Sequence, residues 1–215
     1  ESMKKWDYWG TAEETEKYLD EAKNENYSHF LYASLALNTG ARIGEILALE
    51  WKDVDLKQRR IRIWRILEDA SSKVQERTKG FNERWLGIND ALLEAFLYYK
   101  AQIKFLEPDT PLIHKPNGSR HDHRTVRKIH GQLCRKAAVR EIRIHDLRHT
   151  FASHYIMNGG SLTELQGLLG HSSPMMTLKY AHLAPGFLES RAKVVSFATK
   201  NSQVPRTLRL VASAK

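Results

Sequence analysis

Apolar residues recur at intervals of three and four positions along most of the chain, which is the spacing of one buried face of an α-helix. Thr11 followed by AEETEKYLDEAKNE is typical of a helix start, with an N-cap and acidic residues in the first turn. Further helices are expected over 28–37 and over 41–51, where ARIGEILALEW has helical spacing. Arg42 and Glu45, three residues apart, then share one flank of a helix near its start.

The pattern changes between Val54 and Ile88 to short runs of β-branched and aromatic residues, RIRIWRI and SSKVQERTKGFNERWLGI. Gly80 and Asn82 are turn formers within the second run. We therefore expect two or three antiparallel strands in this region, with Lys79 at or next to a turn.

Helical spacing returns over 89–106, and the prolines that follow end that helix. The later helices are expected at about 122–138, 145–158, 161–169 and 174–183. The predicted fold class is mainly α with a small antiparallel β-sheet, an α+β fold. Residues 1–185 are expected to form one domain, and 186–215 a C-terminal helix and basic tail.

The charge balance points to a polyanionic partner. The chain has 34 basic and 25 acidic residues, a net charge of +9 and a pI near 9.6. Such a balance favours nucleic acid or an anionic membrane surface. The membrane is the weaker alternative, because the longest apolar stretch, near FLYASLAL, is far shorter than the roughly 18 residues that a span needs. No signal peptide opens the chain, so we expect a soluble, cytoplasmic protein without a membrane partner.

Cysteine and metal chemistry are not expected. The single cysteine, Cys134, cannot form an internal disulfide and is interpreted as a small buried apolar residue. CxxC pairs are absent and the acidic residues are scattered. A zinc site built from His145, His149 and His154 is disfavoured, since their spacing lacks the HExxH pattern. We therefore expect no cofactor.

The segment HDLRHTFASHYIM carries both core and candidate site residues. Those expected to face the core are Leu147, Phe151, Tyr155 and Ile156. His145 and Arg148 lie three apart, so both can point into one site. Taken alone, this HxxR pattern is weak, because such residues usually lie on a solvated helix face. Downstream, LLGH ends a short helix at His171, and Tyr180 follows on the next helix.

The strings TGARIGEIL, HDLRHTFAS, LLGH and KYAHL resemble the pattern of the tyrosine recombinases, the phage integrase family, over about residues 10 to 185. The resemblance implies that the catalytic residues are Arg42, Lys79, His145, Arg148, His171 and Tyr180. Glu45 and His149 are expected to support them. The implied function is that of an integrase catalytic domain from a phage or other mobile element, which cuts and rejoins DNA through a 3′-phosphotyrosyl intermediate.

The residue chemistry fits these implied roles. Two guanidiniums, from Arg42 and Arg148, can bind the non-bridging oxygens of a phosphodiester and stabilise charge in the transition state. Their field favours phenolate character on Tyr180, the nucleophile, as it attacks. The resemblance implies that Lys79 is the general acid, either directly or through a water. It also implies that His145 assists proton transfer and that His171 hydrogen-bonds the phosphate.

Three of these residues also suit a purely structural role. Lys79 could be a solvated lysine, His171 a capping or core histidine, and Tyr180 a core aromatic flanked by Met176 and Leu183. A chromosome-dimer resolvase or a type IB topoisomerase would use the same chemistry, and a DNA-binding protein without catalysis is the alternative from a different class.

The expected partner is double-stranded DNA. In the resembling family four protomers assemble on DNA, sometimes with DNA-bending or directionality factors, and a helical DNA-clamping domain precedes the catalytic domain. The chain begins with ESM and has no room for that domain, so we expect a fragment of a longer protein.

Overall fold

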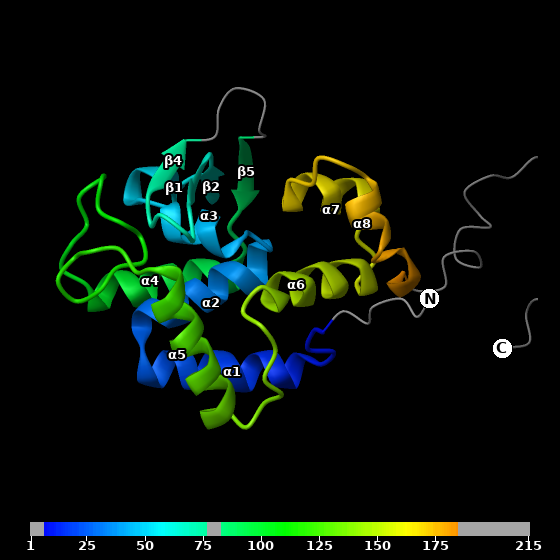
Figure 1. Ribbon diagram of the computed structural model, residues 1–215, viewed down its shortest axis with the longest axis horizontal. Coiled ribbons are helices and arrows are strands. Elements are labelled where there is room, and N and C mark those ends of the chain that lie inside the picture. Colours follow the sequence, from blue (N-terminus) through cyan, green and yellow to red (C-terminus); the bar gives the residue numbers. More distant parts are fainter. Residues whose placement is uncertain (1–6, 77–82, 185–215) are drawn as a thin grey trace, which may run out of the picture. The chain divides into compact units, whose positions relative to one another are not determined.

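The computed structural model describes residues 7–76 and 83–184, and this part of the chain is mainly helical with short antiparallel strands, as predicted (Figure 1). The helices are α1 (Ala12–Glu25), α2 (Tyr27–Thr39), α3 (Ile43–Ala48), α4 (Asp90–Gln102), α5 (His123–Lys136), α6 (Asp146–Met157), α7 (Leu162–Leu169) and α8 (Met175–Leu178). The strands are β1 (Val54–Asp55), β2 (Arg60–Ile63), β3 (Arg65–Leu67), β4 (Val74–Glu76) and β5 (Arg84–Gly87), and two 3₁₀ turns are η1 (Trp51–Asp53) and η2 (Ala181–Leu183).

Three predicted features lie outside the described residues: Lys79, the turn at Gly80 and Asn82, and the C-terminal segment 186–215. Among the described residues, no helix combines the length and apolar character needed to cross a membrane.

Capping residues set the helix boundaries. The backbone N–H of Glu14 donates to Oγ1 of Thr11, and the Glu14 carboxylate accepts from the N–H of Thr11, so α1 begins where the sequence predicts. Ser161 and Glu164 form the same capping box at the start of α7. At the end of α2, Gly40 takes the left-handed conformation with φ of 65°.

Three predicted helices are shorter than expected. The helix predicted over 89–106 ends at Gln102, because Ile103 adopts extended backbone. The helix predicted over 41–51 ends at Ala48, because Leu49 adopts extended backbone and leads into η1. The helix predicted over 174–183 is divided into α8 and η2, so the prediction that Tyr180 lies on a helix is wrong. The N–H of Tyr180 donates to the carbonyl of Thr177, a bond that reaches back three residues and belongs to a tight turn.

The strands form two sheets where one region of two or three strands was expected. The larger sheet has the antiparallel order β1-β2-β5, in which Ile61 pairs with Leu86 and Ile63 pairs with Arg84. After Trp64 the chain changes partner, and β3 pairs with β4 as a separate two-stranded sheet. The antiparallel direction is as predicted, but the number of strands is larger.

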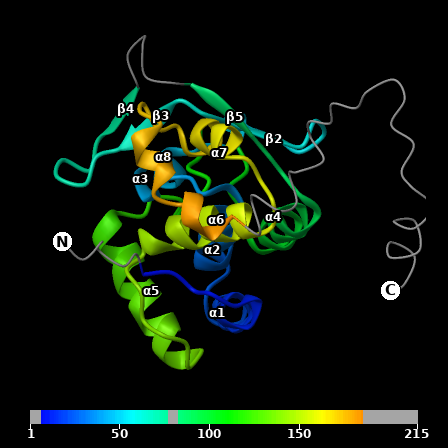
Figure 2. The same ribbon diagram turned by 90° about the vertical axis from the view of Figure 1, so that its right-hand side faces the viewer.

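The helix α2 lies at the centre of the fold and packs against α1, α4 and α6 (Figure 1). The larger core cluster extends from these helices to the strands. A second cluster joins α6, α7 and the last turn, and its buried members are Ala152, Ile156, Leu165, Leu169 and Tyr180. In both views α7 lies beside β5 and near α6 (Figures 1 and 2). The end of α7, which His171 follows closely, is therefore brought next to β5 of the larger sheet.

The predicted core positions of α6 divide into two groups. Leu147 and Ile156 are buried, whereas Phe151 and Tyr155 are half-buried at the edge of the second cluster. Cys134 on α5 is fully buried, as expected. Packing in the core therefore accounts for the apolar residues of α6. The same helix also buries the polar residues Arg148 and His149.

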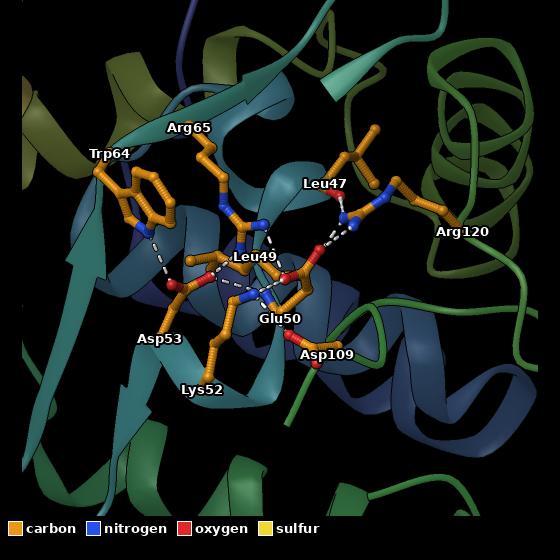
Figure 3. A network of polar contacts seen from close by, with 9 residues as sticks. All are labelled: Leu47, Leu49, Glu50, Lys52, Asp53, Trp64, Arg65, Asp109 and Arg120. Carbon is orange, nitrogen blue, oxygen red and sulfur yellow. Dashed lines mark hydrogen bonds and ion pairs between the residues drawn. The ribbon is translucent and has the colours of Figure 1, made fainter. Parts of the chain in front are cut away.

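A network of buried charges fixes the small sheet to the helical core (Figure 3). Arg65 on β3 donates to Glu50 at 2.7 Å and to Asp53 at 2.5 Å. Trp64 donates its indole N–H to Asp53 at 2.7 Å, and Arg120 donates to Glu50 at 2.9 Å. Because each carboxylate is paired, these charges can be buried, and they connect β3 to the end of α3.

Candidate active site

Five of the six predicted catalytic residues lie in the described part of the chain. They come from the start of α3, from α6 and from the turns that follow α7 and α8. Arg42 and Arg148 donate to the carbonyls of Gly170 and Leu169, directly before His171, and burial, together with the charges of both arginines, lowers the pKa values of His145 and His171. The structure thus brings together residues that are far apart in the sequence.

Arg148 is held by two helix ends. Its Nη1 donates to the carbonyl of Gly40 at 2.7 Å, and its Nη2 donates to the carbonyl of Leu169 at 2.8 Å. The residue is 4% exposed. Burial, and then the charge of Arg42, lower the pKa of Arg148 to about 9, so the guanidinium stays protonated at neutral pH.

Arg42 is the N-cap residue of α3, and Glu45 faces it from the first turn of that helix. The backbone N–H of Arg42 donates to Oε2 of Glu45 at 2.8 Å, and its Nη1 donates to Oε1 at 3.1 Å. Glu45 also accepts two bonds from Arg84, at 3.2 Å and 2.8 Å. Burial alone would raise the pKa of Glu45, but the bonds and charge of Arg84, and then those of Arg42, lower it to about 2. This geometry supports the prediction that Glu45 orients an arginine.

The C-terminal end of α7 collects three guanidiniums. Arg84 donates to the carbonyl of Leu168 at 2.8 Å, Arg148 to that of Leu169 at 2.8 Å, and Arg42 to that of Gly170 at 3.5 Å. The last carbonyls of a helix lack intrahelical partners and carry partial negative charge. They therefore orient three cations that would otherwise repel one another.

His171 follows Gly170 directly and is buried. Its Nδ1 lies 2.8 Å from Oγ1 of Thr177. Burial, and then the charges of Arg148 and Arg42, lower the pKa of His171 to about 4, so the ring is neutral at physiological pH. A neutral imidazole fixed in this way can donate one hydrogen bond to an anion between the arginines.

His145 is the exposed N-cap residue of α6. Partial loss of solvent, and then the charge of Arg148, lower its pKa. Its ring centroid lies 5.5 Å from that of His149, in an edge-on arrangement. His145 is thus placed where the buried side of the site meets solvent.

Tyr180 is 2% exposed, and its hydroxyl lies 2.5 Å from Nδ1 of His149. Burial raises the pKa of Tyr180, and the charge of Arg148 opposes this effect. The field predicted from the arginines is therefore present, but burial outweighs it. Leu183 packs at the edge of the same cluster, whereas Met176, expected to flank Tyr180, is 43% exposed.

Sequence reasoning missed three residues of this region. Arg84 lies on the buried face of β5, where a charged side chain is rarely found unless a group of opposite charge pairs with it. The Nζ of Lys179 lies 5.1 Å from the ring centroid of Tyr180, and burial followed by Arg148 lowers its pKa. Oγ1 of Thr177 lies within hydrogen-bond distance of Nδ1 of His171. Only Arg84 had a sequence signal, because it occupies an inward position in the alternation of RWLG.

The histidines considered for zinc have other contacts. Nε2 of His154 lies 2.9 Å from the backbone carbonyl of Trp9, and His149 contacts Tyr180. Within residues 7–76 and 83–184, no group of three or more histidine, cysteine or acidic side chains is arranged to hold a metal ion.

The chain is similar to known recombinases in sequence. The model of the phage integrase family matches residues 9–186. The chain is 28% identical to the integrase of Salmonella phage P22 over 87% of its own length and 46% of that protein. It is 34% identical to the tyrosine recombinase XerC of Thermodesulfovibrio yellowstonii over 69% of its length and 48% of that protein. The chain thus spans about half the length of these relatives.

Solved structures show the same fold. The catalytic domain of bacteriophage HP1 integrase is 26% identical, with a TM-score of 0.60, and the match covers 86% of this chain and 94% of that one. XerA recombinase is 23% identical, with a TM-score of 0.68 over 92% of this chain and 68% of that one. The Tn1549 transposon integrase in complex with a circular intermediate DNA is 22% identical, with a TM-score of 0.71 over 84% of this chain and 62% of that one. Together with the family match over most of its length, these similarities show that the chain belongs to the phage integrase family.

Proposed function

We propose that this chain is the part of a site-specific recombinase that cuts and rejoins double-stranded DNA through a covalent bond to Tyr180. The observation that carries the proposal is the convergence of Arg42, Arg148 and His171 at the C-terminal end of α7. Such a group of donors suits a phosphodiester, whose non-bridging oxygens gain negative charge in the transition state.

The arginines bind and polarise the phosphate. Each guanidinium is already oriented by a carbonyl, so little reorganisation is needed when DNA enters. The neutral ring of His171 adds a hydrogen bond to one of the phosphate oxygens. Loss of one such donor costs about 3 to 4 kcal/mol of transition-state stabilisation in comparable sites.

Tyr180 supplies the nucleophile. Its phenolic oxygen forms a bond to phosphorus, the bond from phosphorus to the 5′ oxygen breaks, and a 3′-phosphotyrosyl bond remains. The phenol loses a proton, and the leaving oxygen gains one. The covalent bond retains the energy of the broken phosphodiester, so religation by the 5′ hydroxyl needs no ATP.

Proton transfer is assigned to Lys79 and His145. Lys79, which lies outside the described residues, is the general acid in the resembling family, and we assign it the same role here. His145 assists because it lies at the solvent-facing rim of the site beside Arg148. His149 supports Tyr180 through the contact at 2.5 Å.

The whole protein is proposed to integrate or excise a phage or other mobile element. Similarity to the integrase of phage P22 supports this role, and a net charge of +9 favours DNA as the partner. Assembly as four protomers on DNA, with residues 186–215 exchanged between neighbours, is part of the same proposal. Similarity to XerC keeps chromosome-dimer resolution as the alternative role.

A nicked suicide substrate tests the proposal. The short 5′-hydroxyl fragment diffuses away after cleavage, so religation is blocked and a protein–DNA adduct accumulates. Peptide mapping is expected to place the DNA on Tyr180, and Tyr180→Phe is expected to give no adduct. Absence of an adduct from the unchanged chain would favour a DNA-binding protein without catalysis. An adduct on another tyrosine would remove Tyr180 from its role.

A plasmid assay separates the related enzymes. A topoisomerase relaxes a single supercoiled plasmid, whereas a recombinase joins two sites held in one complex. We expect recombination of paired sites and little relaxation of a plasmid that lacks them. Relaxation of any plasmid at the rate of cleavage would favour the topoisomerase.

A further inference from the structure

Arg84 occupies a position where an apolar residue would be expected. In β5 the side chains alternate between buried and exposed, and Arg84 shares the buried face with Leu86. Its partner across the sheet is Ile63, which is also buried. Arg84 itself is 8% exposed. A buried guanidinium is costly unless its charge is paired and its donors are used, so its contacts indicate its role.

All three nitrogens of Arg84 donate to protein oxygens. Nη1 and Nη2 bind the two oxygens of Glu45 at 3.2 Å and 2.8 Å, and Nε binds the carbonyl of Leu168 at 2.8 Å. The side chain therefore connects β5 to α3 and to the end of α7. A guanidinium engaged in this way acts on its neighbours rather than on a ligand.

Arg84 is connected to Arg42 through the carboxylate of Glu45, which both arginines bind. Both oxygens of Glu45 are shared, since Oε1 accepts from the side chains of Arg42 and Arg84, and Oε2 accepts from the backbone of Arg42 and from Arg84. Without Arg84, the buried Glu45 carboxylate would lose two of its hydrogen bonds, and a larger share of its charge would be compensated by Arg42. That guanidinium would then be drawn toward Glu45, and less of its charge would reach a phosphate.

The end of α7 gives Arg84 a second effect. Leu168, Leu169 and Gly170 present consecutive carbonyls to Arg84, Arg148 and Arg42 respectively. A bond between Arg84 and Leu168 fixes the helix end, and the helix end fixes the other two guanidiniums. Arg84 thus influences both phosphate-binding arginines through contacts of about 3 Å.

We propose that Arg84 is a positioning residue for DNA cleavage, which keeps Arg42 and Arg148 oriented toward the scissile phosphate by sharing the charge of Glu45 and anchoring the end of α7. This inference rests on the proposed function. All three nitrogens of Arg84 already donate to Glu45 and Leu168, so its effect passes through the two arginines.

The experiment measures adduct formation in single turnover at saturating protein, on the nicked suicide substrate and on the same substrate with a neutral methylphosphonate at the scissile position. Arg84→Met is expected to slow adduct formation on the phosphodiester by about 10²-fold, the scale of a misplaced catalytic group. The loss on the methylphosphonate is expected to be much smaller, because the neutral group needs less positive charge.

Two further variants separate positioning from folding. Arg84→Lys keeps the charge but cannot bridge Glu45 and Leu168, and is expected to give an intermediate rate. The double change Arg84→Met with Glu45→Gln removes the carboxylate that draws Arg42 away, so its rate is expected to exceed that of Arg84→Met. All rates are measured well below the thermal midpoint of each variant, which is recorded in parallel.

Arg62→Met is the matched control. Arg62 lies on the neighbouring strand β2 and binds Glu83 with two nitrogens at 2.8 Å and 3.0 Å, but this pair is exposed. Its loss is expected to leave both rates unchanged. Equal slowing of Arg84→Met on the two substrates, or no rescue by Glu45→Gln, would overturn the role of Arg84. Absence of any adduct from the unchanged chain would instead overturn the proposed function.

Discussion

The hydroxyl of Tyr180 lies 2.5 Å from Nδ1 of His149, on the side of α6 that faces the second core cluster. Oδ1 of Asp146 lies 4.0 Å from Nε2 of the same ring. A carboxylate on that side favours the tautomer with its proton on Nε2, in which Nδ1 accepts the bond from the tyrosine. The proposed nucleophile therefore bonds a neutral histidine of α6, the helix that also carries Arg148.

This relationship predicts an energetic coupling between the two side chains. Tyr180→Phe and His149→Phe each remove one side of this buried contact, and each is expected to lower the free energy of unfolding by about 1 to 3 kcal/mol. The double variant is expected to lose less than the sum of the two. Urea unfolding of the four proteins measures the coupling. Strict additivity would show that the contact contributes nothing to stability.

Stability is expected to fall as the solution is acidified. Burial, and then the charges of Lys179 and His145, lower the pKa of His149 to about 3, whereas an unfolded histidine titrates near 6.5. Below pH 6.5 the unfolded chain binds a proton that folded His149 does not, so the stability present above that pH is lost progressively toward pH 3. One such group costs about 2 kcal/mol between pH 6.5 and pH 5.

Urea unfolding across this pH range measures the slope. His149→Phe is the comparison, because it removes the titrating group and keeps a ring in its place. Its slope is expected to be smaller than that of the unchanged chain. His171 and His29 have lowered pKa values for the same main reason, burial, so a reduced slope remains in the variant. An unchanged slope would show that His149 is not the titrating group.

Gly40 is expected to tolerate no side chain. Its φ is 65°, and a Cβ would lie 2.4 Å from Cδ1 of Phe151. Gly40→Ala is expected to lower the free energy of unfolding by about 2 to 4 kcal/mol, through left-handed strain and overpacking together. Gly159→Ala is the control, since its φ is 88° but no atom lies within 4 Å of the added carbon. Similar losses of stability at both positions would mean that the left-handed backbone conformation alone causes them, without a contribution from overpacking.

Lys79→Ala tests the general acid. The variant is expected to cleave ordinary DNA about 10² to 10⁴-fold more slowly. The rate of cleavage of a substrate whose 5′ leaving oxygen is replaced by sulfur is expected to be unaffected by Lys79→Ala, because a thiolate leaves without a proton. Adduct formation on both substrates gives the comparison. Equal slowing on the two would assign the proton to another group.

DNA binding by this chain is expected to depend on phosphate contacts. The net charge of +9 predicts an affinity that falls by about 0.9 log units per log unit of salt for each phosphate neutralised. Titrations of two unrelated duplexes across a salt series measure both the slope and the sequence dependence. We expect a steep slope and similar affinities for the two duplexes, and a flat response would contradict electrostatic binding.

The sequence by itself determined the local features of this protein. Helical spacing and the Thr11 capping box located α1, and the alternating run after Val54 indicated antiparallel strands, because these signals involve residues a few positions apart. Residue types in their order, from Arg42 to Tyr180, were sufficient to recognise the family, since the chemistry of a phosphodiester requires cations and a nucleophile.

Only the tertiary structure decided how these residues are held. Arg84 and Glu45 are 39 positions apart, and His149 and Tyr180 are 31 apart, so no local pattern indicates that they bind each other. The pKa of Tyr180 depends on a core formed by α6 and α7, in which loss of solvent raises it more than the nearby charge of Arg148 lowers it. Burial and long-range hydrogen bonds arise from packing of the whole chain, and they set the electrostatics that residue identity alone leaves open.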